Sequence, residues 1–322
     1  MRKARIKVID QTAVYHCVSR VVGGQFLLDD LCKETFRLFM WQQADFAGLQ
    51  ILTYCLMTSH THILVRVPRP SEVSDAELVE RVQVLYGTEA RETVRLREDL
   101  ERGGRIPRKL RERLLKRMGD VSAFMKELKQ RFSRWYNENH DRFGTLWAER
   151  FKSVLVEDES EALRTSAAYI DLNPMRAGLV QDPKDYRYSG YGEAVGGMAK
   201  ARAGLLSVVG QTGWDRGAAE YRVQLYVAGG QAGESGKVVL DRAQILKVQR
   251  AGGAMGCAEA LRLRIRYFTD GLALGSEAYV NEVFWEFRSR FGPRRRSGAR
   301  RLRGLPFVEL RTLRDLKKDV VS

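Results

Sequence analysis

The stretch LQILTYCLMTSHTHILVRV, residues 49–67, decides the fold of this 322-residue chain. It contains two runs rich in apolar and β-branched residues, Leu49–Met57 and His60–Val67, with only Thr58 and Ser59 between them. Runs of this composition across a two-residue gap are typical of antiparallel strands joined by a short turn. Pro68 ends the second run, because proline cannot donate a hydrogen bond within a sheet.

The residues before these strands predict one more strand and a helix. VYHCVSRVV, Val14–Val22, is rich in β-branched residues and is followed by the turn-forming Gly23. Apolar residues at helical spacing between positions 31 and 46 predict a helix that stops at Gly48. A strand, a helix and two adjacent strands, in this order, predict an α+β fold built on an antiparallel sheet.

The next segment is predicted to be a helical insert, at about residues 71–119. It is dense in charge, and stretches such as DAELVERVQVLYG predict short helices. Its basic run RIPRKLRERLLKRMG is explained equally well by a solvated helical surface and by contact with a DNA backbone.

Three further elements follow the insert. Residues 121–139 have apolar side chains along one helical face, which predicts an amphipathic helix. FKSVLVE, Phe151–Glu157, predicts a short strand. A helix is then expected from Asp158, which has the spacing of a reciprocal N-terminal cap with Glu161. This helix should stop or kink at Pro174, since the residue before a proline disfavours helical geometry.

The chain is predicted to divide after residue 197. Glycine and alanine are frequent from about Gly190 to Gly236, so we expect a linker with local structure over residues 198–239. Residues 240–322 are expected to form a smaller, mainly helical and basic region. Within it, Cys257–Gly271 and Ser276–Gly292 predict two helices joined by LALG. Paired helices beside a basic run are typical of helix-turn-helix DNA-binding modules, although helical hairpins are also common without DNA.

The composition is that of a soluble globular protein, with 44% hydrophobic and 30% charged residues. No apolar run approaches the ~20 residues that cross a bilayer, and no secretory leader is expected. Four cysteines without CxxC spacing indicate neither a zinc knuckle nor a disulfide framework. These features predict a cytoplasmic protein with no membrane partner.

The charge points to a polyanionic partner. The formal net charge is +15, and residues 241–322 carry 18 Lys and Arg against 9 Asp and Glu. Eight arginines and no acidic residue occur between positions 288 and 303. Neutralising phosphates releases condensed counterions, so nucleic acid is the partner that we expect.

Two of the four histidines lie one residue apart, at His60 and His62. A strand has a period of two, so both side chains project from the same face, with their Cα atoms ~7 Å apart. Two imidazoles so placed can bind one metal ion. An HxH triplet alone is explained at least as well by two inert, hydrogen-bonded histidines, so the pair needs a further ligand.

Tyr169 and Asn173 are the candidates for completing such a site. They are four residues apart on the predicted helix and therefore share a face. An amide oxygen with two imidazoles leaves coordination positions for water and phosphate, which favours Mg²⁺ or Mn²⁺, although the histidines alone would also accept zinc. A tyrosine beside that ion can attack a phosphodiester. The alternatives are a core tyrosine and an ordinary helix end.

These motifs together resemble the single-tyrosine HUH-type transposases, and most of all the REP-associated tyrosine transposases of bacteria. The resemblance extends over most of residues 13–197 and less closely over the C-terminal region. It depends on five stretches, which are VYHCVSR, LMTSHTHILV, LWAERFKSVLVE, YIDLNPMRAGLV and DYRYSGYGEAVG.

The resemblance implies a ferredoxin-like antiparallel sheet with packed helices. It implies His60, His62 and Asn173 as metal ligands and Tyr169 as the nucleophile. Members of this family cut single-stranded DNA beside a hairpin, form a covalent 5′-phosphotyrosine and release a 3′-hydroxyl. They act as monomers or homodimers. The chain departs from the family pattern at Thr61, where a hydrophobic residue is usual; its hydroxyl needs a hydrogen-bond partner if it is buried.

Contact with DNA is expected from two kinds of side chain. Trp135, Tyr136 and Trp147 can stack on bases, although such residues belong more often to a core. Arginines and a lysine near the catalytic elements and in the basic tail are expected to bind phosphates; these are Arg20, Arg150, Lys152, Arg176, Arg294, Arg295, Arg296, Arg300 and Arg301.

The main hypothesis is therefore a metal-dependent transposase that cleaves and rejoins single-stranded DNA at hairpins. The alternative is a non-catalytic protein that only binds hairpin DNA. A replication initiator or relaxase that uses the same His pair is a third possibility. The single tyrosine beside NPMRAGLV and the lack of a GxxxxGK[ST] nucleotide-binding loop both weigh against it.

Overall fold

The computed structural model describes residues 6–229, 267–302 and 309–314. Its first four strands are β1 (Ala13–Arg20), β2 (Gln50–Leu56), β3 (His60–Val67) and β4 (Lys152–Val156). They lie side by side in the order β2-β3-β1-β4, and every neighbouring pair is antiparallel. With one helix after β1 and another before β4, this is the order of a ferredoxin-like βαββαβ sheet. The predicted α+β class is confirmed.

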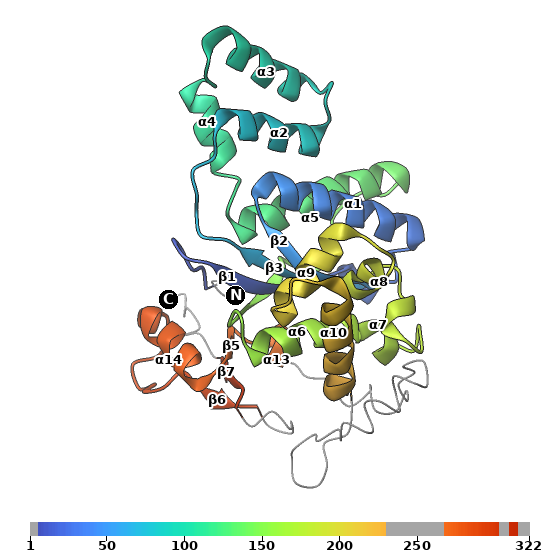
Figure 1. The fold of residues 1–322 in the computed structure, drawn as a ribbon, viewed down its shortest axis with the longest axis vertical. Coiled ribbons are helices and arrows are strands. Elements are labelled where there is room, and N and C mark those ends of the chain that lie inside the picture. The colour runs from blue at the N-terminus through green and yellow to red at the C-terminus, as the bar shows by residue number, and fades with distance from the viewer. Residues whose placement is uncertain (1–5, 230–266, 303–308, 315–322) are drawn as a thin grey trace.

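Two helices cover one face of this sheet, as Figure 1 shows. They are α1 (Asp30–Ala47) and α5 (Val121–Asn139), which pack against each other. Both begin at aspartate caps, because the Asp29 carboxylate accepts from the Cys32 amide and that of Asp120 from the Ala123 amide. Gly48 ends α1 in the left-handed conformation that glycine adopts without strain.

The predicted insert is helical. It consists of α2 (Asp75–Tyr86), α3 (Arg91–Gly103) and α4 (Arg108–Leu115). These three helices project beyond α1, away from the sheet (Figure 1). Val82, Leu96 and Leu114 are buried between them, so the insert has a small core of its own.

The opposite face carries α6 (Glu161–Asp171) and the one-turn helix α7 (Asn173–Arg176). The cap of α6 differs from our expectation. Ser160, and not Asp158, accepts hydrogen bonds from the first amides of α6, because the Asp158 carboxylate forms an ion pair with Arg66 on β3. The expected interruption before Pro174 is present, since one residue, Leu172, separates the end of α6 from the start of α7.

Residues 190–229 form three helices. These are α8 (Gly190–Val195), α9 (Ala199–Val209) and α10 (Trp214–Gly229), and the first two contact β2. Gly204 lets α9 approach the strand closely: a Cβ atom at this position would lie 2.5 Å from the carbonyl oxygen of Ile51. Residues expected to be linker therefore pack on the sheet.

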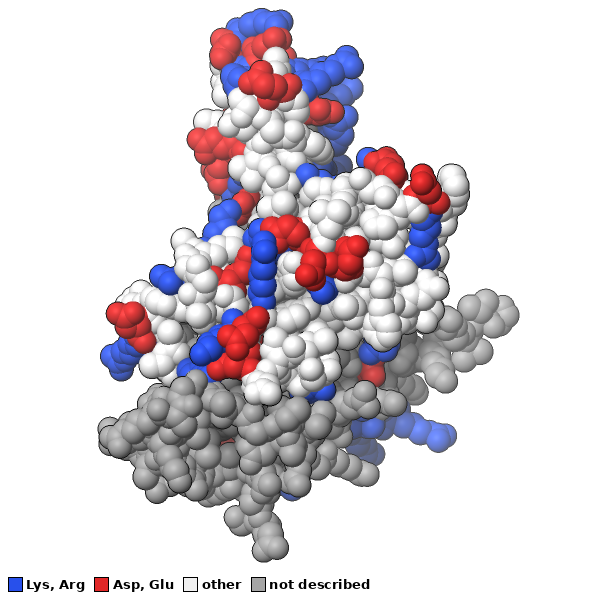
Figure 2. All heavy atoms as spheres, turned by 90° about the vertical axis from the view of Figure 1, so that its right-hand side faces the viewer, with Lys and Arg blue, Asp and Glu red and all other residues white. Residues whose placement is uncertain are grey.

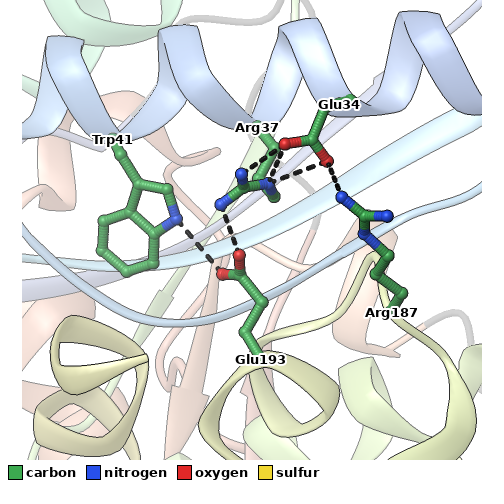
Figure 3. Close-up of polar contacts among 5 residues, drawn as sticks. All are labelled: Glu34, Arg37, Trp41, Arg187 and Glu193. Atoms are coloured by element: carbon green, nitrogen blue, oxygen red, sulfur yellow. Dashed lines mark hydrogen bonds and ion pairs between the residues drawn. The ribbon is translucent and has the colours of Figure 1, made fainter. Parts of the chain in front are cut away.

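A polar network joins α1 to α8 around the β2 edge (Figure 3). The Glu193 carboxylate accepts from Arg37 Nη1 at 2.5 Å and from Trp41 Nε1 at 3.2 Å. Glu34 accepts from Arg37 and, at 3.0 Å, from Arg187 Nη2. Most of these groups are partly buried, so the pairs are worth more than ion pairs on an open surface.

The C-terminal part extends the sheet. Its elements are α13 (Tyr267–Asp270), β5 (Ala273–Gly275), α14 (Glu277–Glu286), β6 (Arg300–Arg301) and β7 (Arg311–Leu313). β5 pairs in parallel with β4, and β7 and β6 follow, which gives a seven-stranded mixed sheet. LALG, expected as the turn of a helical hairpin, instead contributes its last three residues to strand β5. The second predicted helix is α14, whereas most of the first, over residues 257–266, lies outside the described residues.

Candidate active site

His60 and His62 project from one face of the central strand β3. Their ring centroids are 5.1 Å apart, and His62 is 3% exposed. In the antiparallel register of β1 and β3, Arg20 lies opposite His60 and therefore shares this face. The face is the one that α6 covers.

A third histidine, which the sequence analysis missed, contacts the pair. His16 on β1 is fully buried, and its Nε2 lies 2.9 Å from Nδ1 of His62. Its Nδ1 lies 2.7 Å from the carbonyl oxygen of Phe268. The available signal was VYHCVSR itself, because a ferredoxin-like order places the first strand beside the third.

These contacts fix which nitrogen of His62 is free. A carbonyl oxygen only accepts, so Nδ1 of His16 donates to Phe268. Nε2 of a neutral His16 is then an acceptor, and Nδ1 of His62 donates to it. The lone pair of His62 is left on Nε2, the arrangement seen when a second group orients a metal-binding imidazole. We call this the His16–His62 hydrogen-bond chain.

Burial keeps these imidazoles neutral. It lowers the pKa of His16 to about 4. Burial, reinforced by the charges of Arg20 and Arg176, lowers the pKa of His60 to about 4. The pKa of His62 also falls well below its usual value, chiefly through burial. Neutral imidazole is the form that binds a metal, so the histidines fit that role near neutral pH.

Tyr169 comes from α6 to the same place. Its ring centroid is 5.9 Å from that of His62 and 6.0 Å from that of His16. Phe268 stacks on the ring at 4.7 Å, and the side chain is 7% exposed. The fold thus brings the predicted nucleophile beside the predicted ligands.

Asn173 lies one turn beyond Tyr169. Its Nδ2 donates to the carbonyl oxygens of Tyr169 at 2.9 Å and Ile170 at 3.1 Å. These bonds orient the amide and leave Oδ1 as the atom available for a ligand. Two imidazole Nε2 atoms and one amide oxygen suit a divalent cation. For His60, Nε2 carries the lone pair in the tautomer whose Nδ1 donates to Ser59 Oγ, 3.1 Å away.

One cationic group beside the tyrosine has a donor to spare. The guanidinium carbon of Arg176 lies 4.6 Å from the centre of the Tyr169 ring. Its Nη1 is buried and donates to no other described residue. A partly buried cation with an unused donor can bind a phosphate oxygen.

The other predicted phosphate ligands are dispersed. Lys152 on β4 forms ion pairs with Glu149 and Asp270. Arg295 donates to backbone carbonyl groups of Ser297 and Gly298, so it contributes to the C-terminal fold. The remaining five are exposed, one before β4 and four in the C-terminal region; they are Arg150, Arg294, Arg296, Arg300 and Arg301.

The aromatic residues considered for base stacking belong to the core. Tyr136 and Trp147 are 5% and 7% exposed. Trp135 is partly buried and stacks on Phe132. These rings stabilise the packing of α5 and are not a stacking platform.

Thr61 lies between the histidines and points to the other face of β3. It is fully buried, and its hydroxyl has no partner within the described structure. Ser19, its cross-strand neighbour, also has a buried hydroxyl without a hydrogen-bond partner in the described structure. The strand thus accommodates threonine here, but its hydroxyl is desolvated without a compensating hydrogen bond.

Basic and acidic side chains are interspersed over the face shown in Figure 2, so this side presents no continuous basic field. Among the described helices, none combines the length and apolar character needed to cross a membrane.

No protein-family model and no curated protein matches the sequence. Among solved structures, the chain is similar to a REP-associated tyrosine transposase bound to a REP hairpin. The two share 14% sequence identity with a TM-score of 0.41, and the match covers 61% of this chain and 87% of the transposase chain.

Proposed function

We propose that this protein is a metal-dependent, single-stranded DNA endonuclease and strand transferase that acts at hairpin DNA through a covalent 5′-phosphotyrosine. The observation that carries the proposal is the approach of Tyr169, on α6, to His62, on the central strand. A phenol beside a neutral imidazole pair and a partly buried guanidinium is a constellation suited to attack on a phosphodiester.

His60, His62 and Asn173 would hold Mg²⁺ or Mn²⁺. The ion would polarise a phosphate oxygen and offset the charge that develops on it. The His16–His62 hydrogen-bond chain presents Nε2 of His62 and keeps its ring from turning.

The chain's own residues account for the rest of the reaction. Arg176 binds the scissile phosphate through its free Nη1 and holds it against the tyrosine. The phenol of Tyr169 loses its proton as its oxygen forms a bond to phosphorus. The bond to the 3′-oxygen breaks, and that oxygen takes up a proton. A 3′-hydroxyl that later attacks the phosphotyrosine restores the phosphodiester and the phenol, so rejoining needs no nucleotide.

Hairpin DNA is the proposed substrate for two reasons. The net charge of +15 favours a polyanion. The motifs around His60 and Tyr169 resemble those of transposases that cut beside small hairpins.

The test is to mix the full-length protein with Mn²⁺ or Mg²⁺ and labelled hairpin oligonucleotides from the flanks of its own gene. We expect an SDS-stable protein–DNA adduct that is lost in Tyr169→Phe and in EDTA. Tyr86→Phe is the matched control, because Tyr86 is an exposed tyrosine on the insert. An adduct that persists in Tyr169→Phe would show that another residue is the nucleophile.

One observation favours the alternative of a non-catalytic hairpin-binding protein. Phe268 stacks on Tyr169 and leaves little of it exposed. Tight hairpin binding without adduct or cleavage, with several divalent ions, would support that function.

A further inference from the structure

Three metal-binding side chains meet where the start of α1 approaches the end of α5. They are Asp29, which caps α1, Cys32 in its first turn, and His140, directly after α5. One ligand atom from each lies within 4.8 Å of the other two. Cys32 Sγ lies 3.8 Å from His140 Nε2. We call these residues the Cys32 cluster.

His140 is oriented toward the sulfur. Its Nδ1 lies 2.9 Å from the carbonyl oxygen of Tyr136 and must donate to it. Its ring also stacks on that of Tyr136, with centroids 4.0 Å apart and an angle of 7°. The lone pair of the neutral imidazole is therefore on Nε2, toward Cys32. A histidine whose other nitrogen donates to a backbone carbonyl is the usual form of a metal ligand.

Asp29 is charged and has an oxygen to spare. Its Oδ1 accepts from the Cys32 amide at 2.8 Å, and this bond lowers the pKa of the carboxyl group. The second oxygen can bind a ligand. Cys32 is fully buried, and burial, with the nearby Asp29, raises the pKa of its thiol to about 12. A metal ion that binds here must displace the thiol proton.

We propose that Asp29, Cys32 and His140 form a zinc site, with the fourth position taken by water. Thiolate, imidazole and carboxylate are the ligands of Zn²⁺, and tetrahedral bonds of ordinary length place sulfur and nitrogen about 3.5 Å apart. The thiolate excludes Mg²⁺ and Mn²⁺, which prefer oxygen. The site is thus chemically distinct from the proposed active site, and the proposal holds whether or not the protein cleaves DNA.

Zinc at this place would fasten two elements that are distant in sequence. It would tie the segment before α1 to the end of α5. That segment contacts the β2–β3 turn, because the Leu28 amide donates to the Thr58 carbonyl oxygen at 3.0 Å. Thr58 is two residues from His60. The zinc site would hence stabilise the β2–β3 turn that precedes the histidine pair, without taking part in the proposed reaction.

Cobalt substitution is the direct test. Full-length protein without a histidine tag is stripped with chelator and titrated with Co²⁺. We expect a near-ultraviolet charge-transfer band from cobalt–thiolate bonding, which no ligand of the proposed active site can produce. His60→Ala should retain the band. Cys32→Ser and His140→Gln should both lose it, and agreement between them guards against a folding defect in either.

Zinc content and thermal stability supply the second measurement. After loading and gel filtration, wild-type protein and His60→Ala should retain one zinc that His140→Gln lacks. Asp29→Asn keeps the helix cap, because asparagine caps as well as aspartate, but should bind zinc about 10- to 100-fold more weakly. A wild-type protein without the cobalt–thiolate band, or a zinc-induced rise in Tm that is as large in His60→Ala combined with Cys32→Ser as in His60→Ala alone, would overturn the proposal. The contact would then be a thiol–imidazole hydrogen bond alone.

Discussion

His62 has one nitrogen left for a ligand because His16 occupies the other. This relation depends on a carbonyl group from α13 at one end and on burial, which keeps both rings neutral. In the proposed function, the chemistry of the strand would therefore depend on a residue that is itself no ligand. His16 would be a positioning residue.

Replacing His16 tests that role. His16→Phe fills the same space but cannot accept from Nδ1 of His62. We expect affinity for Mn²⁺ to fall about 10- to 100-fold, with hairpin affinity unchanged. Calorimetric titration of Mn²⁺ and a gel-shift assay measure the two quantities. Equal Mn²⁺ affinity in the variant and the wild type would mean that the hydrogen bond does not prepare the ligand.

Thr61, on the other face of the strand, provides a test of stability in which the reaction should not change. Thr61→Val keeps the β-branched shape and removes a buried hydroxyl without a partner. The free energy of unfolding should rise by about 1 kcal/mol, because the desolvation penalty is removed. Urea denaturation measures this change, and adduct formation should be unaffected. A lower free energy of unfolding in Thr61→Val would show that the Thr61 hydroxyl forms a hydrogen bond in solution.

Local pattern was enough to predict His60, His62 and Tyr169 as candidates, because strand and helix periods decide which side chains share a face. Their approach to one another depends on tertiary packing, which only the family resemblance predicted from the sequence. His16 was missed because its role depends on the register between β1 and β3, which no local pattern contains. Cys32 and His140 were missed because they are distant in the sequence, whereas the ligands of one metal ion are usually sought within a few residues of each other.

At the scale of elements, α6 is held in place by a buried carboxyl group. Asp171 accepts from Thr53 Oγ1 at 2.8 Å, from the Tyr191 amide at 3.2 Å and from the Tyr221 hydroxyl. It thereby joins α6 to β2, α8 and α10. No cation faces it in the described structure, and burial raises its pKa to about 7.

This raised pKa predicts a pH dependence of stability. Between the unfolded value near 4 and about 7, the folded protein binds more protons at Asp171 than the unfolded chain does. Stability should therefore fall as pH rises through this window, by up to about 1.4 kcal/mol per pH unit from this group. Asp171→Asn should lack that component. Urea titrations of both proteins from pH 5 to 8 measure the difference, and parallel curves would contradict the prediction.

The contact of α9 with β2 gives a further prediction for an element. Gly204→Ala would place a Cβ atom against backbone carbonyl oxygens of β2, which cannot move without disturbing the sheet. We expect a loss of about 1–3 kcal/mol in the free energy of unfolding. Gly103→Ala is the matched control: it is helical with open space around it, and should be neutral or slightly stabilising. Similar changes in both variants would exclude the close contact.

The same contact explains why residues 198–239 were difficult to interpret from sequence. Their frequent glycine and alanine predict a linker with local structure. In α9 the small residues instead permit a helix to lie directly on a strand, since a larger side chain at Gly204 would hold the two apart. Composition alone does not distinguish flexibility from close packing.

For the whole molecule, the distribution of charge predicts where DNA binds. Arg294 and Arg296 are exposed in the C-terminal region, whereas Arg105 and Lys109 are exposed on the insert. Replacing the first pair by glutamine should reduce the log–log salt dependence of hairpin binding by about 1.4 to 1.8 units if both contact phosphates. Replacing the second pair removes the same charge and should leave the slope unchanged. The reverse result would place the DNA on the insert.

The hydrogen-bond chain behind His62 ends at a carbonyl of residue 268, late in the chain. During synthesis, the ferredoxin-like strands and Tyr169 leave the ribosome well before this segment is made. A nascent polypeptide can therefore build the sheet while His16 still lacks its acceptor and Tyr169 its covering ring. Translation itself sets the order of events, and a product that terminates early carries the histidine pair and the tyrosine without the part that completes their surroundings.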